Sequence, residues 1–114
     1  MYDYIIVGAG LYGLLISYKL NLQNKKILLI DKKDTRKKNK FDYMIISKKS
    51  YMFLEKILCI EMNDFIYKKC NQILFNQKIL NKSYYILDLK KLRRYLYNNL
   101  NNVELKFNTT IHPL

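Results

Sequence analysis

Histidine, cysteine, glycine and acidic residues are all scarce in this chain, and the first two scarcities bear on its chemistry. The single histidine, His112, stands in the C-terminal tail, and we interpret it as an ordinary tail residue rather than a ligand. Cys59 and Cys70 are eleven positions apart, which is neither a CxxC redox pair nor a zinc pattern. We interpret them as ordinary thiols of a reducing compartment, or as small apolar core residues. No metal site is expected, and the catalytic residues stay unknown.

The scarcity of acids leaves a formal charge of +12, from 21 Lys and Arg against 9 Asp and Glu. Such an excess is typical of proteins that bind nucleic acid or membrane surfaces. Here the basic residues are mostly scattered, as on a solvated surface, and only residues 32–40 form a dense cluster. We therefore expect no specific nucleic-acid partner. A peripheral contact with an anionic membrane stays open.

An uncharged run over residues 4–18 resembles the apolar part of a signal peptide. Its flank argues against that interpretation, because Asp3 precedes it and no small-residue cleavage site follows. The run is also too short, and too interrupted by glycine, to span a bilayer. The sequence thus predicts no targeting segment and no membrane span, and we expect a cytoplasmic location.

All three glycines of the chain fall within six positions, at Gly8, Gly10 and Gly13. The apolar, β-branched run before them, residues 2–7, predicts a buried strand. Apolar residues at helical spacing predict a helix over about 11–22, and residues 26–31 predict a second buried strand. Strand, helix and strand in about 30 residues make a βαβ unit with parallel strands.

The rest of the chain predicts an excursion followed by a helix and a third strand. Residues 32–40 read as a solvated loop, 41–47 as a short strand or extended piece, and 50–62 as a helix that Ser50 caps. Two or three short strands are expected within 65–87. Asp88 is an acceptable N-cap for a helix whose leucine stripe ends near 98–102, and residues 103–107 predict a strand. We expect one α/β domain over 1–114, Rossmann-like, with a parallel sheet.

The glycine spacing is GxGxxG, which becomes specific only in a strand–turn–helix context with an acid about 20 residues on. Asp31, at the end of the second predicted strand, supplies the acid. Gly8 would allow the tight turn, Gly10 the close approach of a pyrophosphate, and Gly13 the packing of helix on sheet. The open N–H groups near Leu11 and Tyr12 would face the phosphates.

A carboxylate at Asp31 would accept hydrogen bonds from a ribose diol, and it disfavours a 2′-phosphate and hence NADP. A glycine-rich turn that binds nothing is the alternative. The residues expected to bind the cofactor are Gly8, Gly10, Leu11, Tyr12, Gly13, Asp31 and Lys32. These residues do not by themselves separate FAD from NAD, because both present an ADP half to this fold.

"YDYIIVGAGLYG" followed by "KKILLIDKK" resembles the FAD-binding start of the glutathione-reductase-like flavoproteins. One similar branch contains lycopene cyclases, geranylgeranyl reductases and aromatic-ring hydroxylases, and residues 84–111 resemble its later helix and strand. Those cyclases and hydroxylases usually carry an Arg before that helix, where this chain has Asp88 and Lys90. The other branch, UDP-galactopyranose mutase, continues with a "GGN" that is absent here, because no glycine follows Gly13.

The resemblance implies an FAD-dependent enzyme whose N-terminal portion holds the ADP half of FAD, with NAD as the alternative cofactor. A later glycine-containing FAD motif of the class is missing, so a second chain or domain would have to complete the site. A non-catalytic nucleotide-binding module or fragment is a second hypothesis. A basic protein for nucleic acid or membrane is a third, and it would use residues 32–40 and the tyrosines.

Overall fold

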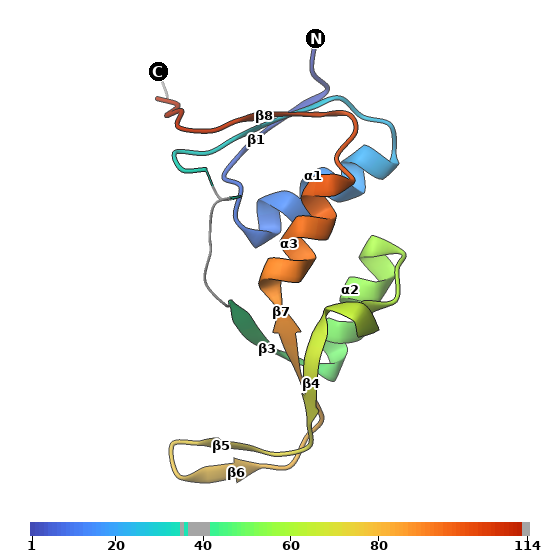
Figure 1. Cartoon of the computed structure of the whole chain (residues 1–114), viewed down its shortest axis with the longest axis vertical. Coiled ribbons are helices and arrows are strands. Elements are labelled where there is room, and N and C mark those ends of the chain that lie inside the picture. Colours follow the sequence, from blue (N-terminus) through green and yellow to red (C-terminus); the bar gives the residue numbers. More distant parts are fainter. Residues whose placement is uncertain (35, 37–41, 113–114) are drawn as a thin grey trace. The chain divides into compact units, whose positions relative to one another are not determined.

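The computed structural model describes residues 1–34, 36 and 42–112 (Figure 1). Its contacts divide the chain into two compact units. Unit 1 comprises Met1–Asn39 and Arg93–Leu114, and unit 2 comprises Lys40–Leu92. Unit 2 is therefore an excursion between two pieces of unit 1, as the sequence predicts.

Unit 1 contains the predicted βαβ arrangement and the third strand. The chain forms β1 (Tyr4–Val7), α1 (Leu11–Leu22) and β2 (Ile27–Ile30), and returns as β8 (Val103–Lys106). The three strands form a parallel sheet in the order β1-β2-β8. The α/β fold class and the parallel sheet are thus confirmed, with each strand one or two residues shorter than predicted.

The core of unit 1 forms between this sheet and α1. Leu14 of the helix and Ile27 and Leu29 of β2 are fully buried. Two buried polar residues of α1 have partners: the Ser17 hydroxyl donates to the Gly13 carbonyl at 2.7 Å, and Asn21 bonds Asn99 and Asn102. Because their polar atoms are paired, these residues can lie in the core without the penalty of an unmade hydrogen bond.

Unit 2 is an antiparallel sheet with helices on it and a hairpin extending from it (Figure 1). Its strands β3 (Tyr43–Ser47), β7 (Tyr84–Asp88) and β4 (Ile66–Cys70) pair in the order β3-β7-β4. Leu54 and Leu58 of α2 (Lys48–Leu58) are buried, as are Ile46 and Leu87 of the sheet. A 3₁₀ turn, η2 (Met62–Phe65), leads into β4, and β5 (Ile73–Phe75) and β6 (Lys78–Leu80) form the hairpin.

Unit 2 contains a helix and short strands, as the sequence predicts, but the number of strands and the bounds of the helix differ from the prediction. Residues 65–87 contain four strands rather than two or three, because the isolated hairpin adds its own pair. The second helix begins at Lys48, and its N-cap is Ser47, not Ser50: the Ser47 hydroxyl accepts the Ser50 N–H at 3.1 Å. The helix ends at Leu58 rather than near residue 62, and its Phe53 is 61% exposed.

The helix α3 (Leu89–Asn98) carries the chain from unit 2 back into unit 1. Asp88 caps it as predicted, since its Oδ1 accepts the Lys91 N–H at 3.1 Å. Leu89, Leu92 and Leu96 of the predicted stripe are buried. The helix ends at Asn98, where the run of asparagines begins.

Left-handed backbone positions are filled mainly by asparagine in this glycine-poor chain. Among the described residues, Asn24, Asn76 and Asn108 have positive φ, and Cys59 and Gln77 are the other non-glycine cases. Asparagine tolerates this conformation better than most side chains. The three glycines all lie between the end of β1 and the first turn of α1.

Candidate functional site

The predicted cofactor-binding residues of unit 1 gather where the parallel strands end. β1, β2 and β8 run in the same direction, so their carboxyl ends share one edge of the sheet. The turn from β1 into α1 and the residue after β2 both lie at this edge (Figure 1). Ligands of open α/β sheets bind in the crevice outside this edge.

Gly8 makes the sharp turn out of β1. Its φ is +107°, a conformation that side-chain-bearing residues rarely adopt, and its N–H donates to the Ile30 carbonyl at 2.7 Å. The hydrogen bond continues the β1–β2 pairing by one residue while the chain is already turning. A glycine is therefore required here by backbone conformation, as the motif predicts.

Gly13 is required for a different reason, which is space. A Cβ on Gly13 would overlap the Gly8 carbonyl oxygen and come within 3.0 Å of the Gly8 carbonyl carbon. It would also lie 3.7 Å from Cγ2 of Ile6. The first turn of α1 thus approaches β1 and the turn more closely than any other residue type would permit.

Gly10 has no such crowding, because a Cβ there would meet no described protein atom within 4 Å. Its φ of −71° and ψ of −174° suit any residue, and it is the N-cap of α1 with no side-chain cap. In the part of the chain that the structure describes, the Leu11 and Tyr12 N–H groups have no acceptor. The helix start therefore offers open space and unpaired donors, which favour an anion.

Asp31 follows β2 directly and faces this turn. Its Oδ2 accepts the Ala9 N–H at 2.6 Å, and its Oδ1 accepts the Lys33 N–H at 3.0 Å. The hydrogen bond from Lys33 and then that from Ala9 lower the pKa of the Asp31 carboxyl, against a smaller opposing effect of burial. Asp31 is therefore ionised at neutral pH. Each carboxylate oxygen accepts only one of these bonds and retains capacity for a ligand hydroxyl.

The remaining predicted residues lie at the same edge of the sheet, and fewer contacts fix their side chains. Tyr12 is 81% exposed in the first turn of α1, so its ring is accessible to a ligand. Leu11 beside it is half-buried. Lys32 is exposed, and its backbone N–H is a further cause of the lowered pKa of Asp31.

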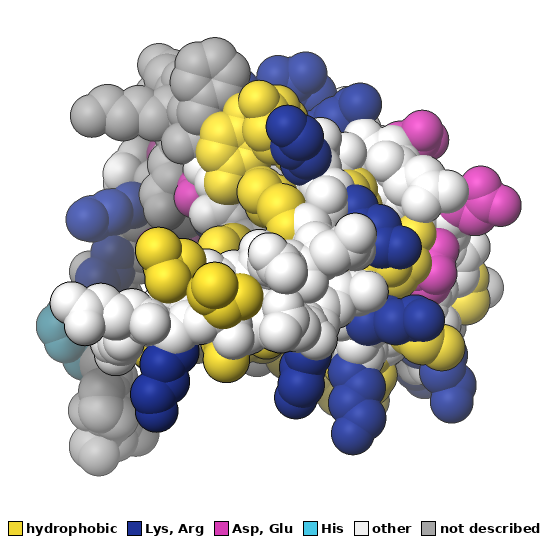
Figure 2. All heavy atoms as spheres, turned by 90° about the horizontal axis from the view of Figure 1, so that it is seen from below, with side chains coloured by type: hydrophobic (Ala, Val, Ile, Leu, Met, Phe, Trp, Pro, Cys, Tyr) yellow, Lys and Arg dark blue, Asp and Glu magenta, His cyan; other side chains and the backbone are white. Residues whose placement is uncertain are grey.

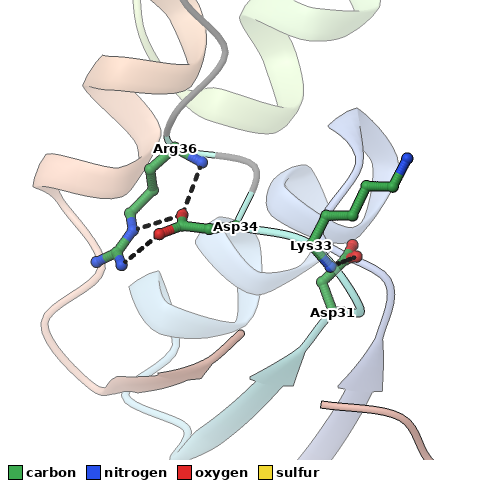
Figure 3. A network of polar contacts seen from close by, with 4 residues as sticks. All are labelled: Asp31, Lys33, Asp34 and Arg36. Atoms are coloured by element: carbon green, nitrogen blue, oxygen red, sulfur yellow. Dashed lines mark hydrogen bonds and ion pairs between the residues drawn. The ribbon is translucent and has the colours of Figure 1, made fainter. Parts of the chain in front are cut away.

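The start of the basic segment forms a small polar network (Figure 3). Arg36 donates from Nε and Nη2 to the two carboxylate oxygens of Asp34, each at 3.0 Å, and its guanidinium carbon lies 4.7 Å from the centre of the Phe107 ring. The Lys33 backbone N–H donates to the Asp31 carboxylate, while the Lys33 side chain extends away from Asp31. The lysines at 37, 38 and 40, on which the dense basic cluster depends, lie outside the described residues.

Sequence reasoning missed two participants. Ala9 is not among the predicted site residues, yet its N–H donates to the Asp31 carboxylate. Thr109, in a tail for which no structure was predicted, donates its N–H to the Asp31 carbonyl at 3.1 Å. The signal for Ala9 was its place inside the turn, whereas nothing in the sequence marked Thr109.

The two cysteines and the histidine, for which the sequence predicts no functional role, do not form a candidate site in the part of the chain that is described. Cys59 is exposed and Cys70 half-buried, and both are free thiols, so Cys59 is not a core residue. His112 is exposed in the tail. No group of three or more His, Cys, Asp or Glu side chains there could hold a metal ion. None of the described helices is long and apolar enough to cross a membrane.

Comparison with known proteins bears on this unit directly. Residues 6–35 match the model of NAD(P)-binding Rossmann-like domains. That range runs from β1 through the glycine turn, α1 and β2 to just beyond Asp31. It covers the geometry described above and leaves unit 2 unmatched.

Solved structures extend the similarity to nearly the whole chain. It matches PqsL of P. aeruginosa, a structure in complex with 2-aminobenzoylacetate, at 19% identity over 98% of this chain and 35% of that one (TM-score 0.73). It matches p-nitrophenol 4-monooxygenase PnpA of Pseudomonas putida at 14% identity over 95% and 32% (TM-score 0.72). A geranylgeranyl bacteriochlorophyll reductase-like protein of Thermoplasma acidophilum matches at 19% over 94% and 30% (TM-score 0.63).

These identities show the fold alone, and the fold is that of the N-terminal part of FAD-binding monooxygenases. Another PqsL structure is described as a probable FAD-dependent monooxygenase. The chain spans about a third of the length of each of these proteins. The excursion of unit 2 is thus shared with them, although the family model stops before it.

Proposed function

We propose that this chain binds the ADP half of FAD as the N-terminal dinucleotide-binding portion of a flavin-dependent oxidoreductase. The observation that carries the proposal is the arrangement of Asp31 beside the α1 start. An ionised carboxylate suited to a ribose diol lies next to unpaired N–H groups suited to a pyrophosphate. NAD is the alternative cofactor, because it presents the same ADP half.

In this proposal each predicted residue has a role that its geometry supports. Gly8 and Gly13 hold the turn tight against β1, and Gly10 keeps the approach to the helix start open. The Leu11 and Tyr12 N–H groups receive the pyrophosphate, and Asp31 binds the ribose hydroxyls. Tyr12 and Lys32 flank the nucleotide. When bound, the flavin would supply the redox chemistry, and the chain would position its adenosine end.

Residues 1–114 would form one partial domain, with unit 2 inserted between β2 and β8. The structural neighbours are about three times as long as this chain, which supports a site completed by further polypeptide, as a second domain or a second chain. The flavoprotein would be similar to the branch that contains lycopene cyclases, geranylgeranyl reductases and aromatic hydroxylases. Neighbours that include two monooxygenase structures and a reductase-like protein favour this branch.

Two other functions stay as alternatives. A protein like UDP-galactopyranose mutase has the same opening but continues with a glycine pair that this chain lacks. A nucleotide-binding module without catalysis needs no more than the turn and Asp31. Comparing ADP with FAD separates this module from the flavoprotein, because the flavin half of FAD adds binding free energy only in the flavoprotein.

The test is thermal unfolding of the chain with ADP, FAD or NAD, since a ligand that binds only the folded state raises its melting temperature. We expect ADP and FAD to raise it, and a yellow protein with flavin absorbance would favour the flavoprotein over the module. Equal shifts with ADP and FAD, from a colourless protein, would favour the module. No shift with any of the three would contradict nucleotide binding altogether.

Gly10→Val is the sharpest variant for this test. Valine fits the Gly10 backbone conformation and meets no described protein atom, so the fold should persist while the side chain fills the pyrophosphate's place. We expect the ligand shift to disappear. Gln23→Val, at the exposed far end of α1, is the matched control and should keep the shift. A shift that survives in Gly10→Val would show that the motif is not the binding site.

A further inference from the structure

The β5–β6 hairpin of unit 2 stands apart from the three-stranded sheet of that unit. Among the described strands, β5 and β6 pair only with each other, through Ile73–Leu80, Leu74–Ile79 and Phe75–Lys78. Asn76 and Gln77 form the two-residue turn, both at positive φ, and a Gln72–Asn81 side-chain hydrogen bond of 2.9 Å closes the base. Two-stranded ribbons of this kind are only marginally stable in water unless something covers them.

The hairpin also exposes large apolar side chains on both of its faces. Leu74 is 73% exposed, Phe75 64%, Ile79 62% and Leu80 40%. Leu74 and Ile79 are cross-strand partners and so form a continuous apolar pair on one face. A cluster of this kind, unlike single exposed apolar residues, marks an interaction surface.

The charge around the hairpin has one sign. Residues 65–87 contain four lysines and no acidic residue. All four lysines are exposed: Lys68, Lys69, Lys78 and Lys82. Figure 2, which views the molecule from the hairpin end, shows Lys or Arg side chains next to hydrophobic ones on this face.

We propose that the β5–β6 hairpin is a membrane-docking element that places its apolar side chains at the surface of an anionic lipid bilayer. Lysines complement the negative surface potential of such a bilayer, and their long side chains can keep the charge at the headgroups while the neighbouring residues enter the acyl boundary. Three of the four most exposed apolar residues of the hairpin are aliphatic. Lipid therefore fits the hairpin better than nucleic acid, whose bases stack on aromatic rings.

The first experiment measures how the full chain sediments with vesicles of phosphatidylcholine alone or with about 30% phosphatidylserine. We expect binding to the anionic vesicles, weakened by salt and by Ile79→Thr. Losing the buried aliphatic surface of one isoleucine should reduce partitioning by about fivefold. Ile45→Thr, at a β3 residue that is 57% exposed, is the matched control and should bind like the wild type. Equal binding by the two variants would overturn the proposal, as would no binding to either vesicle.

A second measurement reports on the hairpin even if Ile79→Thr unfolds it. The natural chain has no tryptophan, so Phe75→Trp introduces a single fluorescent probe. We expect its emission to shift to the blue with anionic vesicles and to be quenched by brominated lipid. Phe53→Trp, at a comparably exposed α2 residue, should do neither. A Phe75→Trp emission unchanged by bound vesicles would show that the hairpin stays in water and would overturn the proposal.

A charge variant separates lipid from nucleic acid. Lys78→Gln with Lys82→Gln should weaken vesicle binding more than Lys48→Gln with Lys49→Gln, which removes the same charge from the start of α2. Competition with single-stranded RNA should leave the vesicle-bound fraction unchanged. If RNA displaces the vesicles through the same two lysines, the surface is a nucleic-acid site and the membrane proposal fails.

Discussion

The carboxylate of Asp31 accepts a hydrogen bond of 2.6 Å from the backbone N–H of Ala9, across 22 residues of sequence. This bond ties the residue after β2 to the middle of the glycine turn. Hydrogen bonds to an ionised acceptor are shorter and stronger than neutral ones. The acid at the strand end is thus held by the turn, besides being available to a ligand.

Asp31→Asn should destabilise the protein even without ligand. Ala9 and Lys33 donate to different carboxylate oxygens, and the amide replaces one of these oxygens by an NH2 group that cannot accept from either N–H. We expect a loss of about 1–3 kcal/mol in the free energy of unfolding, measured by urea denaturation at neutral pH. Glu104→Gln, an exposed acid of β8, is the control and should change it by less than about 0.5 kcal/mol. Equal effects of the two variants would mean that the Ala9 bond contributes nothing.

The pH dependence of this difference has a defined sign. The pKa of the Asp31 carboxyl is lowered from 3.8 in the folded state, so ionised Asp31 stabilises the fold above that value. As the pH falls below 3.8 and through the folded value, the carboxyl protonates and the contribution is lost. The stability gap between wild type and Asp31→Asn should therefore be full at neutral pH and shrink at about pH 3. A gap that widens on acidification would contradict the assignment.

Gly13→Ala and Gly10→Ala test two different reasons for glycine in one motif. The new Cβ at Gly13 overlaps the Gly8 carbonyl, so the helix or the turn must move. We expect a cost of about 1–3 kcal/mol in unfolding free energy. At Gly10 the Cβ meets no described atom, so the cost should be limited to the loss of a favoured N-cap residue, about 0.5–1 kcal/mol. If Gly10→Ala costs more than Gly13→Ala, the packing explanation for Gly13 is wrong.

The βαβ unit could be predicted from sequence because its signals are local. A β-branched run, a glycine turn and helical spacing each act within a few residues, and the α1 bounds were predicted correctly from Leu11 to Leu22. The α2 cap could not be chosen in this way. Ser47 and Ser50 are the same residue type three positions apart, and the pairing of Ser47 with Tyr84 in the sheet keeps Ser47 extended, so that the helix starts after it.

Within the glycine turn, the roles of two residues could be predicted because the backbone there requires glycine. Positive φ at Gly8 and crowding at Gly13 each require glycine, so these positions can be read from the pattern. The N–H groups of Ala9 and Thr109 are backbone groups that every non-proline residue carries. Their contacts with Asp31 depend on how distant strands end together, which the sequence does not display.

Cys59→Gly should stabilise unit 2, because Cys59 caps α2 in the left-handed conformation, with φ 54° and ψ 37°. Glycine adopts this conformation without steric cost and is the usual residue at such helix ends, so the gain should be about 0.5–1 kcal/mol, with a corresponding rise in melting temperature. Cys59→Ala is the control. It removes the same thiol, including its weak 3.6 Å contact with the Lys56 carbonyl, but keeps a Cβ and should bring no gain. If the alanine variant stabilises as much as the glycine variant, the effect comes from losing the exposed thiol and not from the backbone. A gain confined to glycine would show that this glycine-poor chain tolerates conformational strain at a helix end outside the motif where its glycines are concentrated.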